Sequence, residues 1–154
     1  MSKDNVERFN RLAGSIFAKL YESFPVPIRL SASDFHKEIF DSDQSDKEQR
    51  SDQNLNADAF FRATVNWLTE AGYLTNKGGP LTGDKFNECV LTAKALEVLK
   101  TKPKNIVGAE SLGKQLADAV KEGAVSKIKE LTSETLSKGL GAIFSAGMLM
   151  FGGS

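Results

Sequence analysis

The chain has 154 residues, 40% of them hydrophobic, so it can bury a sizeable core and disorder is not the default. Its 20 basic and 20 acidic side chains give a formal net charge of zero, which excludes a global positive field that attracts nucleic acid. A lone cysteine, Cys89, excludes an internal disulfide, and the sequence opens without a charged-then-apolar leader pattern. We therefore expect a cytoplasmic location.

Residues 6–24 predict an amphipathic helix, because large apolar side chains recur at spacings of three and four. Pro25 and Pro27 disfavour helical geometry before them, so the helix should end near Phe24 and an extended PVPIRL segment should follow. The predicted inward face is Phe9, Ala13, Ile16, Phe17, Leu20 and Phe24.

The next stretch predicts a short helix and then an exposed loop. Ser31 or Ser33 is suited to cap the helix, whose inward side chains would be Phe35, Ile39 and Phe40. Residues 41–56, DSDQSDKEQRSDQNLN, have almost no apolar side chains and cannot offset the ordering cost of a packed element. We therefore interpret them as a loop.

A second helix is predicted from Ala57 to Ala71, with Asn56 as its cap and Gly72 in the left-handed exit position. Trp67 lies at one border of its apolar stripe. The stripe consists of Phe60, Phe61, Thr64, Val65, Leu68 and Ala71.

Residues 73–91, YLTNKGGPLTGDKFNECVL, predict two strands joined by a turn-rich centre with Gly78, Gly79, Pro80 and Gly83. Thr92 then caps a helix, AKALEVLK, which ends before Pro103. We interpret residues 102–104 as a linker.

From about Ala109 a long amphipathic helix is predicted, and the last sixteen residues, 139–154, contain no charged side chain. An exposed apolar chain end must be buried in the chain's own core, in a second copy or in a bilayer. Sixteen residues fall short of the ~20 that span a bilayer as a helix, so we rank self-association first. The residues assigned to it are Leu112, Leu116, Val120, Ile128, Leu131, Ile143, Phe144 and Phe151.

The element order, with WLTEAGYL before the hairpin and LTAKALEVL after it, resembles the winged helix-turn-helix family over residues 6–100. Ala95 departs from that pattern, which often has glycine there. The resemblance implies a mainly α fold: a winged helix with a small β-hairpin in residues 1–104, followed by a C-terminal helical extension, residues 105–154. It also implies that the helix ending at Ala71 reads DNA and that residues 75–87 form the wing.

Local charge bears on this implied role. Residues 61–108 carry seven basic and four acidic side chains, whereas residues 31–60 carry three basic and eight acidic ones. Arg62 and Asn66 are the outward residues of the implied reading helix that suit base edges, and Lys77 and Lys85 suit phosphates. We therefore assign these four residues to DNA binding.

The residues with chemical potential give no catalytic pattern. His36 has no second histidine or cysteine at ligand spacing, so we expect an ordinary surface histidine. Cys89 has no adjacent base, so we expect it to pack in the core. GGPLTGDK lacks the spacing and ending of a phosphate-binding loop. We expect no enzyme, no metal and no cofactor.

The sequence thus favours a DNA-binding, transcriptional-regulator-like protein that dimerises through its C-terminal helix. Two alternatives stay open. The first is a protein-interaction and oligomerisation module that does not bind DNA, which the neutral charge favours. The second is a membrane-acting effector that uses residues 139–151, which the charge-free tail favours.

Overall fold

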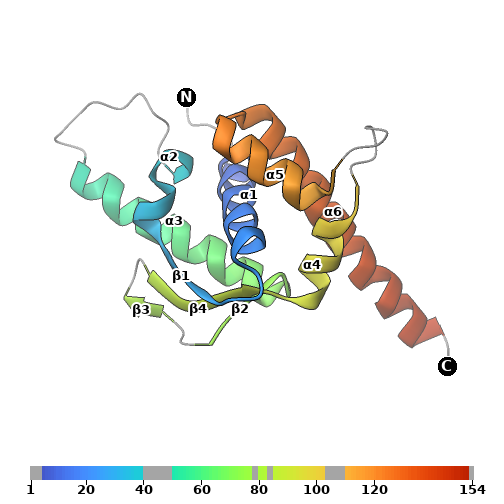
Figure 1. Cartoon of the computed structure of the whole chain (residues 1–154). Coiled ribbons are helices and arrows are strands. Elements are labelled where there is room, and N and C mark those ends of the chain that lie inside the picture. Colours follow the sequence, from blue (N-terminus) through green and yellow to red (C-terminus); the bar gives the residue numbers. More distant parts are fainter. Residues whose placement is uncertain (1–4, 40–49, 78–79, 83–84, 103–109, 153–154) are drawn as a thin grey trace.

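The computed structural model describes residues 5–39, 50–77, 80–82, 85–102 and 110–152, with side chains for all of these except 50–56, 80–82 and 142–152. This part of the chain is mainly helical (Figure 1). It contains six α-helices, a short 3-10 helix and one four-stranded antiparallel sheet. The predicted mainly α fold with a small sheet is confirmed.

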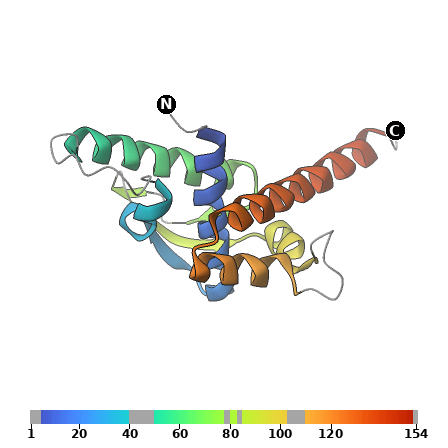
Figure 2. The same ribbon diagram turned by 90° about the horizontal axis from the view of Figure 1, so that it is seen from above.

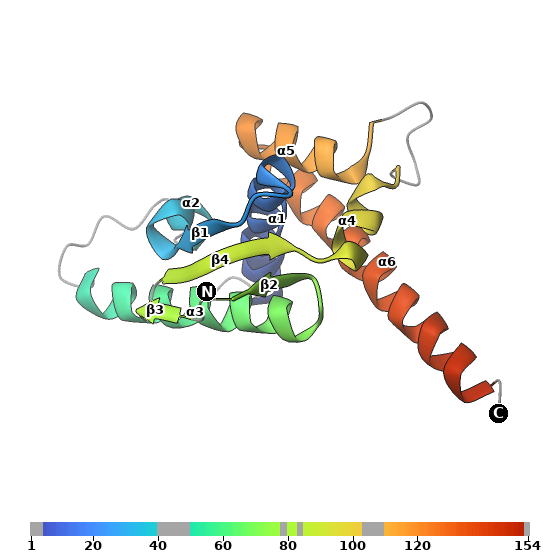
Figure 3. The same cartoon turned by 60° about the horizontal axis from the view of Figure 1, so that its bottom comes forward.

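Helix α1 (Asn5–Ser23) is the central element, with the sheet and the other helices around it (Figure 3). Residues 12–18 are all buried, so α1 packs on every side in this stretch and not along one stripe. The small residues among them let neighbouring helices approach closely. The helix ends before Pro25 as predicted, but Phe24 lies beyond it and is 36% exposed, so its predicted inward position is wrong.

Short elements connect α1 to the next long helix. Strand β1 (Ile28–Ser31) follows the two prolines, and the 3-10 helix η1 (Ala32–Phe35) leads into the single turn α2 (His36–Ile39). The backbone N–H of Ser31 donates to the Asp34 carboxylate at 3.3 Å, which orders the start of η1. The predicted inward residues Phe35 and Ile39 are buried, and Phe40 lies outside the described residues.

Helix α3 (Arg50–Glu70) is longer than predicted. The predicted start at Ala57, with Asn56 as cap and residues 41–56 as a loop, is wrong for residues 50–56. Four of the seven residues 50–56 are serine, aspartate or asparagine, which are poor helix formers, so propensity does not explain the extension. Adding turns to a helix that is already packed costs little, because the rest of the helix already supplies the nucleus. Residues 41–49 lie outside the described part. The buried stripe is Ala57, Phe61, Thr64, Val65 and Leu68.

Strand β4 (Lys85–Leu91) is the centre of the sheet. It pairs antiparallel with β1, with β2 (Leu74–Asn76) and with β3 (Pro80–Thr82). The predicted hairpin is therefore present, and β1 adds to it as a further strand. Local sequence did not indicate that pairing, because its partners are distant along the chain.

Helix α4 (Ala93–Lys100) begins as predicted at Thr92, whose side-chain oxygen accepts from the backbone N–H of Ala95 at 3.2 Å. The same hydroxyl donates to the carbonyl of Gly72 at 2.5 Å. Gly72 itself has φ +85°, the left-handed exit expected for it. Thr92 thus connects the end of α3 to the start of α4.

The predicted long C-terminal helix is two helices, α5 (Leu112–Glu122) and α6 (Val125–Gly152). Gly123, with φ +71°, ends α5, and its backbone N–H donates to the carbonyls of Ala119 and Val120. An apolar stripe does not reveal such a break, because it continues through the turn.

One hydrophobic core joins both parts of the chain. Leucines and isoleucines of α5 and of the first half of α6 are buried together with those of α1. The hydroxyl of Tyr73, the residue before β2, donates to the carbonyl of Leu136 in α6 at 3.0 Å. The predicted boundary after residue 104 therefore marks no gap in the core.

The C-terminal half of α6 extends away from the rest of the molecule (Figures 1 and 3). Leu140, close to where the helix leaves the body, is 47% exposed. Within the described residues, no helix combines the length and the apolar character needed to cross a membrane.

Candidate functional site

The outer face of α3 carries the two residues assigned to base recognition. Arg62 and Asn66 lie one helical turn apart, and both are exposed. Phe61, Val65 and Leu68 on the opposite face are fully buried and fix the rotation of the helix about its axis. The helix itself lies at an edge of the molecule (Figure 2).

The two lysines assigned to phosphate contacts belong to the hairpin, one on each side of its central glycines. Lys77 directly follows β2 and is exposed. Lys85 begins β4, is partly exposed, and pairs with Ser31 of β1 and Thr82 of β3. The predicted wing glycines, Gly78, Gly79 and Gly83, lie outside the described residues.

The charge on α3 is low. Between residues 57 and 70 its single basic side chain, Arg62, is accompanied by Asp58 and Glu70. Lys94 does not add to it, because its ammonium group donates to the carbonyl of Ala71 at 2.6 Å and lies 4.0 Å from the centre of the Tyr73 ring. If this face of the protein binds DNA, most of the positive charge that attracts phosphates must therefore come from the neighbouring hairpin and not from α3.

Lys94 and Tyr73 hold the corner between α3 and β2. Burial lowers the pKa of Lys94 and raises the pKa of Tyr73, because each loses solvation of its charged form. The ammonium group caps a carbonyl at the C-terminal end of α3, where a cation is favoured. These contacts are structural, and they fix the orientation of the helix.

Most residues assigned to self-association lie in the chain's own core. Leu112, Leu116, Ile128 and Leu131 are at most 4% exposed, and Val120 packs against the same core. These five residues are therefore covered by the chain itself, and their burial requires no second copy of the protein. The remaining three, Ile143, Phe144 and Phe151, have side chains outside the described part of the structure.

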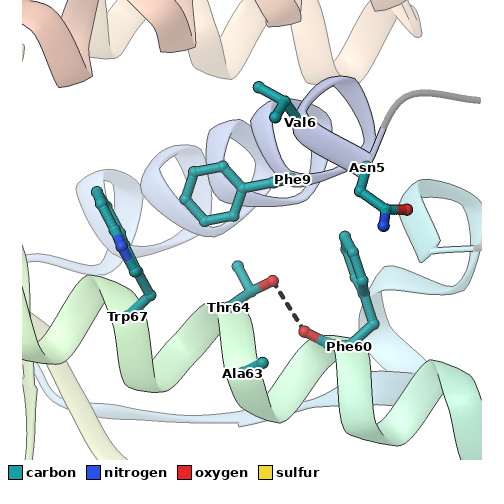
Figure 4. A pocket seen from close by; sticks show the side chains of 7 residues that line it. All are labelled: Asn5, Val6, Phe9, Phe60, Ala63, Thr64 and Trp67. Atoms are coloured by element: carbon teal, nitrogen blue, oxygen red, sulfur yellow. Dashed lines mark hydrogen bonds between the residues drawn. The ribbon is translucent and has the colours of Figure 1, made fainter.

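An apolar groove that was not predicted from the sequence lies between the first turns of α1 and the middle of α3 (Figure 4). Its volume is about 450 Å³. Trp67, placed by the sequence at the border of a buried stripe, is 41% exposed and forms one end of the groove. The lining residues are Asn5, Val6, Phe9, Phe60, Ala63, Thr64 and Trp67.

Contacts within the chain hold the aromatic walls of the groove in place. The Trp67 ring packs edge-on against Phe9, with centroids 5.2 Å apart, and stacks on Tyr73 at 6.2 Å. The Arg8 guanidinium lies 4.4 Å from the centre of the Phe60 ring. The walls are therefore preorganised before anything binds.

The sequence did contain a signal for this groove. Phe60, Ala63 and Trp67 follow one another at spacings of three and four on α3, beside the buried stripe and not within it. A second apolar row of this kind remains partly exposed unless another element covers it. The predicted inward position of Phe60 and edge position of Trp67 hid this row, because they assign both side chains to the buried stripe.

The residues considered for chemistry lie apart. His36 is exposed on α2, and Cys89 is fully buried in β4. Burial raises the pKa of the Cys89 thiol to about 11, so the nucleophilic thiolate is rare at neutral pH. Among the described residues, histidine, cysteine, aspartate and glutamate form no cluster of three that is suited to a metal ion.

Comparisons of the chain with protein-family models, with curated proteins and with solved structures give no significant match. The class of protein must therefore be argued from the chain's own features. Two features are available: the outer face of α3 beside the hairpin, and the apolar groove between α1 and α3.

Proposed function

We propose that residues 5–100 form a winged helix-turn-helix module that binds duplex DNA. The chain order supports this: a helix, a short strand, a helical turn, a long helix, a hairpin and a closing helix. The same order of elements, together with the segments WLTEAGYL and LTAKALEVL, is the basis of the resemblance to the winged helix-turn-helix family. In this proposal α3 enters the major groove and the β2–β4 hairpin lies on the sugar-phosphate backbone.

The observation that carries the proposal is the exposure of Arg62 and Asn66 on a helix whose opposite face is fixed in the core. Arginine pairs with guanine and asparagine with adenine through two hydrogen bonds each. Lys77 and Lys85, on the adjoining hairpin, supply the ammonium groups that hold phosphates. The lysines would give affinity, and the α3 residues would give preference among sequences.

We further propose that the protein assembles as a dimer through the part of α6 that extends from the body. The exposed Leu140 and the charge-free residues 139–154 support this, because an apolar chain end requires cover. A dimer would present two copies of α3 to two half-sites.

A protein-binding role without DNA is the second candidate. The specific observation in its favour is the low charge of α3, one basic against two acidic side chains in residues 57–70. The two candidates differ in one measurable respect: DNA binding requires affinity for phosphate, and protein binding does not.

Fluorescence anisotropy with a labelled random duplex at low salt tests the first candidate. The double variant Lys77→Glu, Lys85→Glu should weaken binding at least about tenfold, because two attractive contacts become repulsive. The matched control is Lys102→Glu, Lys127→Glu, which makes the same charge change at two exposed lysines away from the hairpin. Equal affinity of both variants would show that the hairpin is not the contact surface.

A further inference from the structure

We propose that the groove between α1 and α3 is a binding site for a neutral, aromatic small molecule. The site is independent of DNA binding and involves none of the four residues assigned to it. Three features of the groove support this: its volume, the chemistry of its lining and the rigidity of its walls.

The size of the groove suits a small molecule. Its volume of about 450 Å³ lies within the range of roughly 300–1,000 Å³ that is usual for such sites. A partner helix would instead need a longer channel that takes anchors over several turns. The described lining covers only the first turns of α1 and two turns of α3.

The lining defines the charge of the ligand. None of the seven lining side chains is ionisable. The Arg8 guanidinium beside Phe60 already donates to the carbonyl of Ile39 at 2.9 Å. A charged group placed against these walls would therefore lose solvation without gaining a partner of opposite charge in the lining, which is costly. The ligand is therefore neutral.

The lining also defines the polarity and shape of the ligand. Phe9, Phe60 and Trp67 present aromatic surfaces, which favour a flat ring. The Thr64 hydroxyl already donates to the carbonyl of Phe60 at 2.8 Å. The carboxamide of Asn5 lies beside Phe60 at the edge of the groove (Figure 4), where it can meet one polar group of the ligand. An aromatic body with a single hydrogen-bonding group fits these walls.

Trp67 makes the site directly measurable, because it is the only tryptophan in the chain. The probe is N-phenyl-1-naphthylamine, a neutral aromatic amine that accepts energy from tryptophan. We expect saturable quenching of the Trp67 emission that corresponds to one site. The anionic relative 8-anilinonaphthalene-1-sulfonate should bind at least about tenfold more weakly.

Two alanines of α3 provide a matched pair of variants. Both are exposed, but Ala63 lines the groove and Ala59 does not. Ala63→Leu fills the groove and should weaken probe binding at least about tenfold, whereas Ala59→Leu should stay within about twofold of the parent chain. Circular dichroism melting verifies that both variants are folded. If Ala63→Leu is destabilised, Val6→Ser on the opposite wall replaces it, with an expected loss of about threefold.

Three results would overturn the proposal. The first is equal affinity of the Ala63 and Ala59 variants for the neutral probe. The second is equally tight binding of the anionic dye. The third is a change in molar mass on Ala63→Leu, measured by light scattering, since the groove would then be an interface between copies of the chain.

Discussion

Gly14 of α1 faces Thr132 and Ile128 of α6 at close range. A Cβ atom at this position would overlap the side chains of Thr132 and Ile128. The Thr132 hydroxyl donates to the carbonyl of Ile128 at 2.6 Å, so it is held in place and cannot easily move aside. The missing side chain at Gly14 therefore sets the distance between the two helices.

We predict that Gly14→Ala lowers the free energy of unfolding by about 1–3 kcal/mol, because the added methyl group overpacks a filled interface. Urea denaturation followed by circular dichroism measures the change. The control is Gly141→Ala, also inside a helix, where a Cβ atom meets none of the described residues within 4 Å; both variants are measured on monomeric protein. The alanine there should leave stability unchanged or raise it slightly, and the same loss in both variants would contradict the packing argument.

Cys89 gives a prediction that depends on pH. Burial raises its pKa from 9.0 to about 11 in the folded protein. The folded state therefore holds the thiol proton more tightly than the unfolded state. The resulting contribution to stability is fully present below pH 9 and is lost as pH rises towards 11.

Accordingly, the free energy of unfolding should fall between pH 9 and 11 by about 2 kcal/mol more in the parent chain than in Cys89→Ala. Urea titrations at a series of pH values measure this difference. Lysine and tyrosine titrations affect both proteins alike and cancel in the comparison. Parallel pH profiles would show that the thiol is not desolvated.

At the scale of elements, α5 and the first half of α6 share the hydrophobic core with the elements that precede residue 104. Tyr73 and Lys138 each bond to groups on the other side of the predicted boundary: Tyr73 to the carbonyl of Leu136, and Lys138 to the Thr101 hydroxyl and the Lys102 carbonyl. The last turns of α6 extend away from these contacts (Figure 1). The chain should therefore tolerate loss of the end of α6 but not loss of its beginning.

Two truncations test this division. A chain ending at residue 104 loses Leu112, Leu116, Ile128 and Leu131, whose burial contributes about 6–12 kcal/mol, comparable to the whole stability of a domain. It should show no cooperative thermal transition. A chain ending at Gly141 should melt cooperatively and be monomeric by light scattering, whereas the full chain should be dimeric. A folded chain of 104 residues, or a dimer that survives truncation at Gly141, would refute the assigned roles.

Local signals predicted much of the fold. Sequence correctly predicts the end of α1 before Pro25, the start of α4 at Thr92 and the left-handed exit at Gly72. Each of these depends on backbone geometry that is set by residues close in sequence. The pairing of β1 with β4 joins Ile28 to Cys89, and no local pattern encodes so distant a contact. The row of Phe60, Ala63 and Trp67 indicates one wall of the groove, but the other wall comes from α1, and local sequence does not indicate that crossing.

The predicted site residues illustrate another limit. Exposure of Arg62 and Asn66 follows from helical periodicity, and the structure has both exposed. Burial of Leu112 and Ile128 also follows from periodicity, but the pattern does not state whether the covering surface belongs to the same chain. The structure supplies that surface in α1.

At the scale of the whole molecule, α1 packs against two groups of elements. On one side, α5 and the first half of α6 complete the core. On the other, α3 lies at an edge of the molecule with the hairpin next to it (Figures 2 and 3). This leaves α3 accessible to a long partner such as a duplex, while the end of α6 stays available for a second copy.

The affinity of the full chain for a random DNA duplex over a salt series tests the central proposal most directly. With phosphate contacts from Lys77 and Lys85, log affinity should fall linearly with log salt, at a slope of about −1.8 or steeper. Fluorescence anisotropy gives the slope without knowledge of the preferred site. Absence of binding at low salt, or an affinity independent of salt, would contradict DNA binding and favour a protein partner for α3.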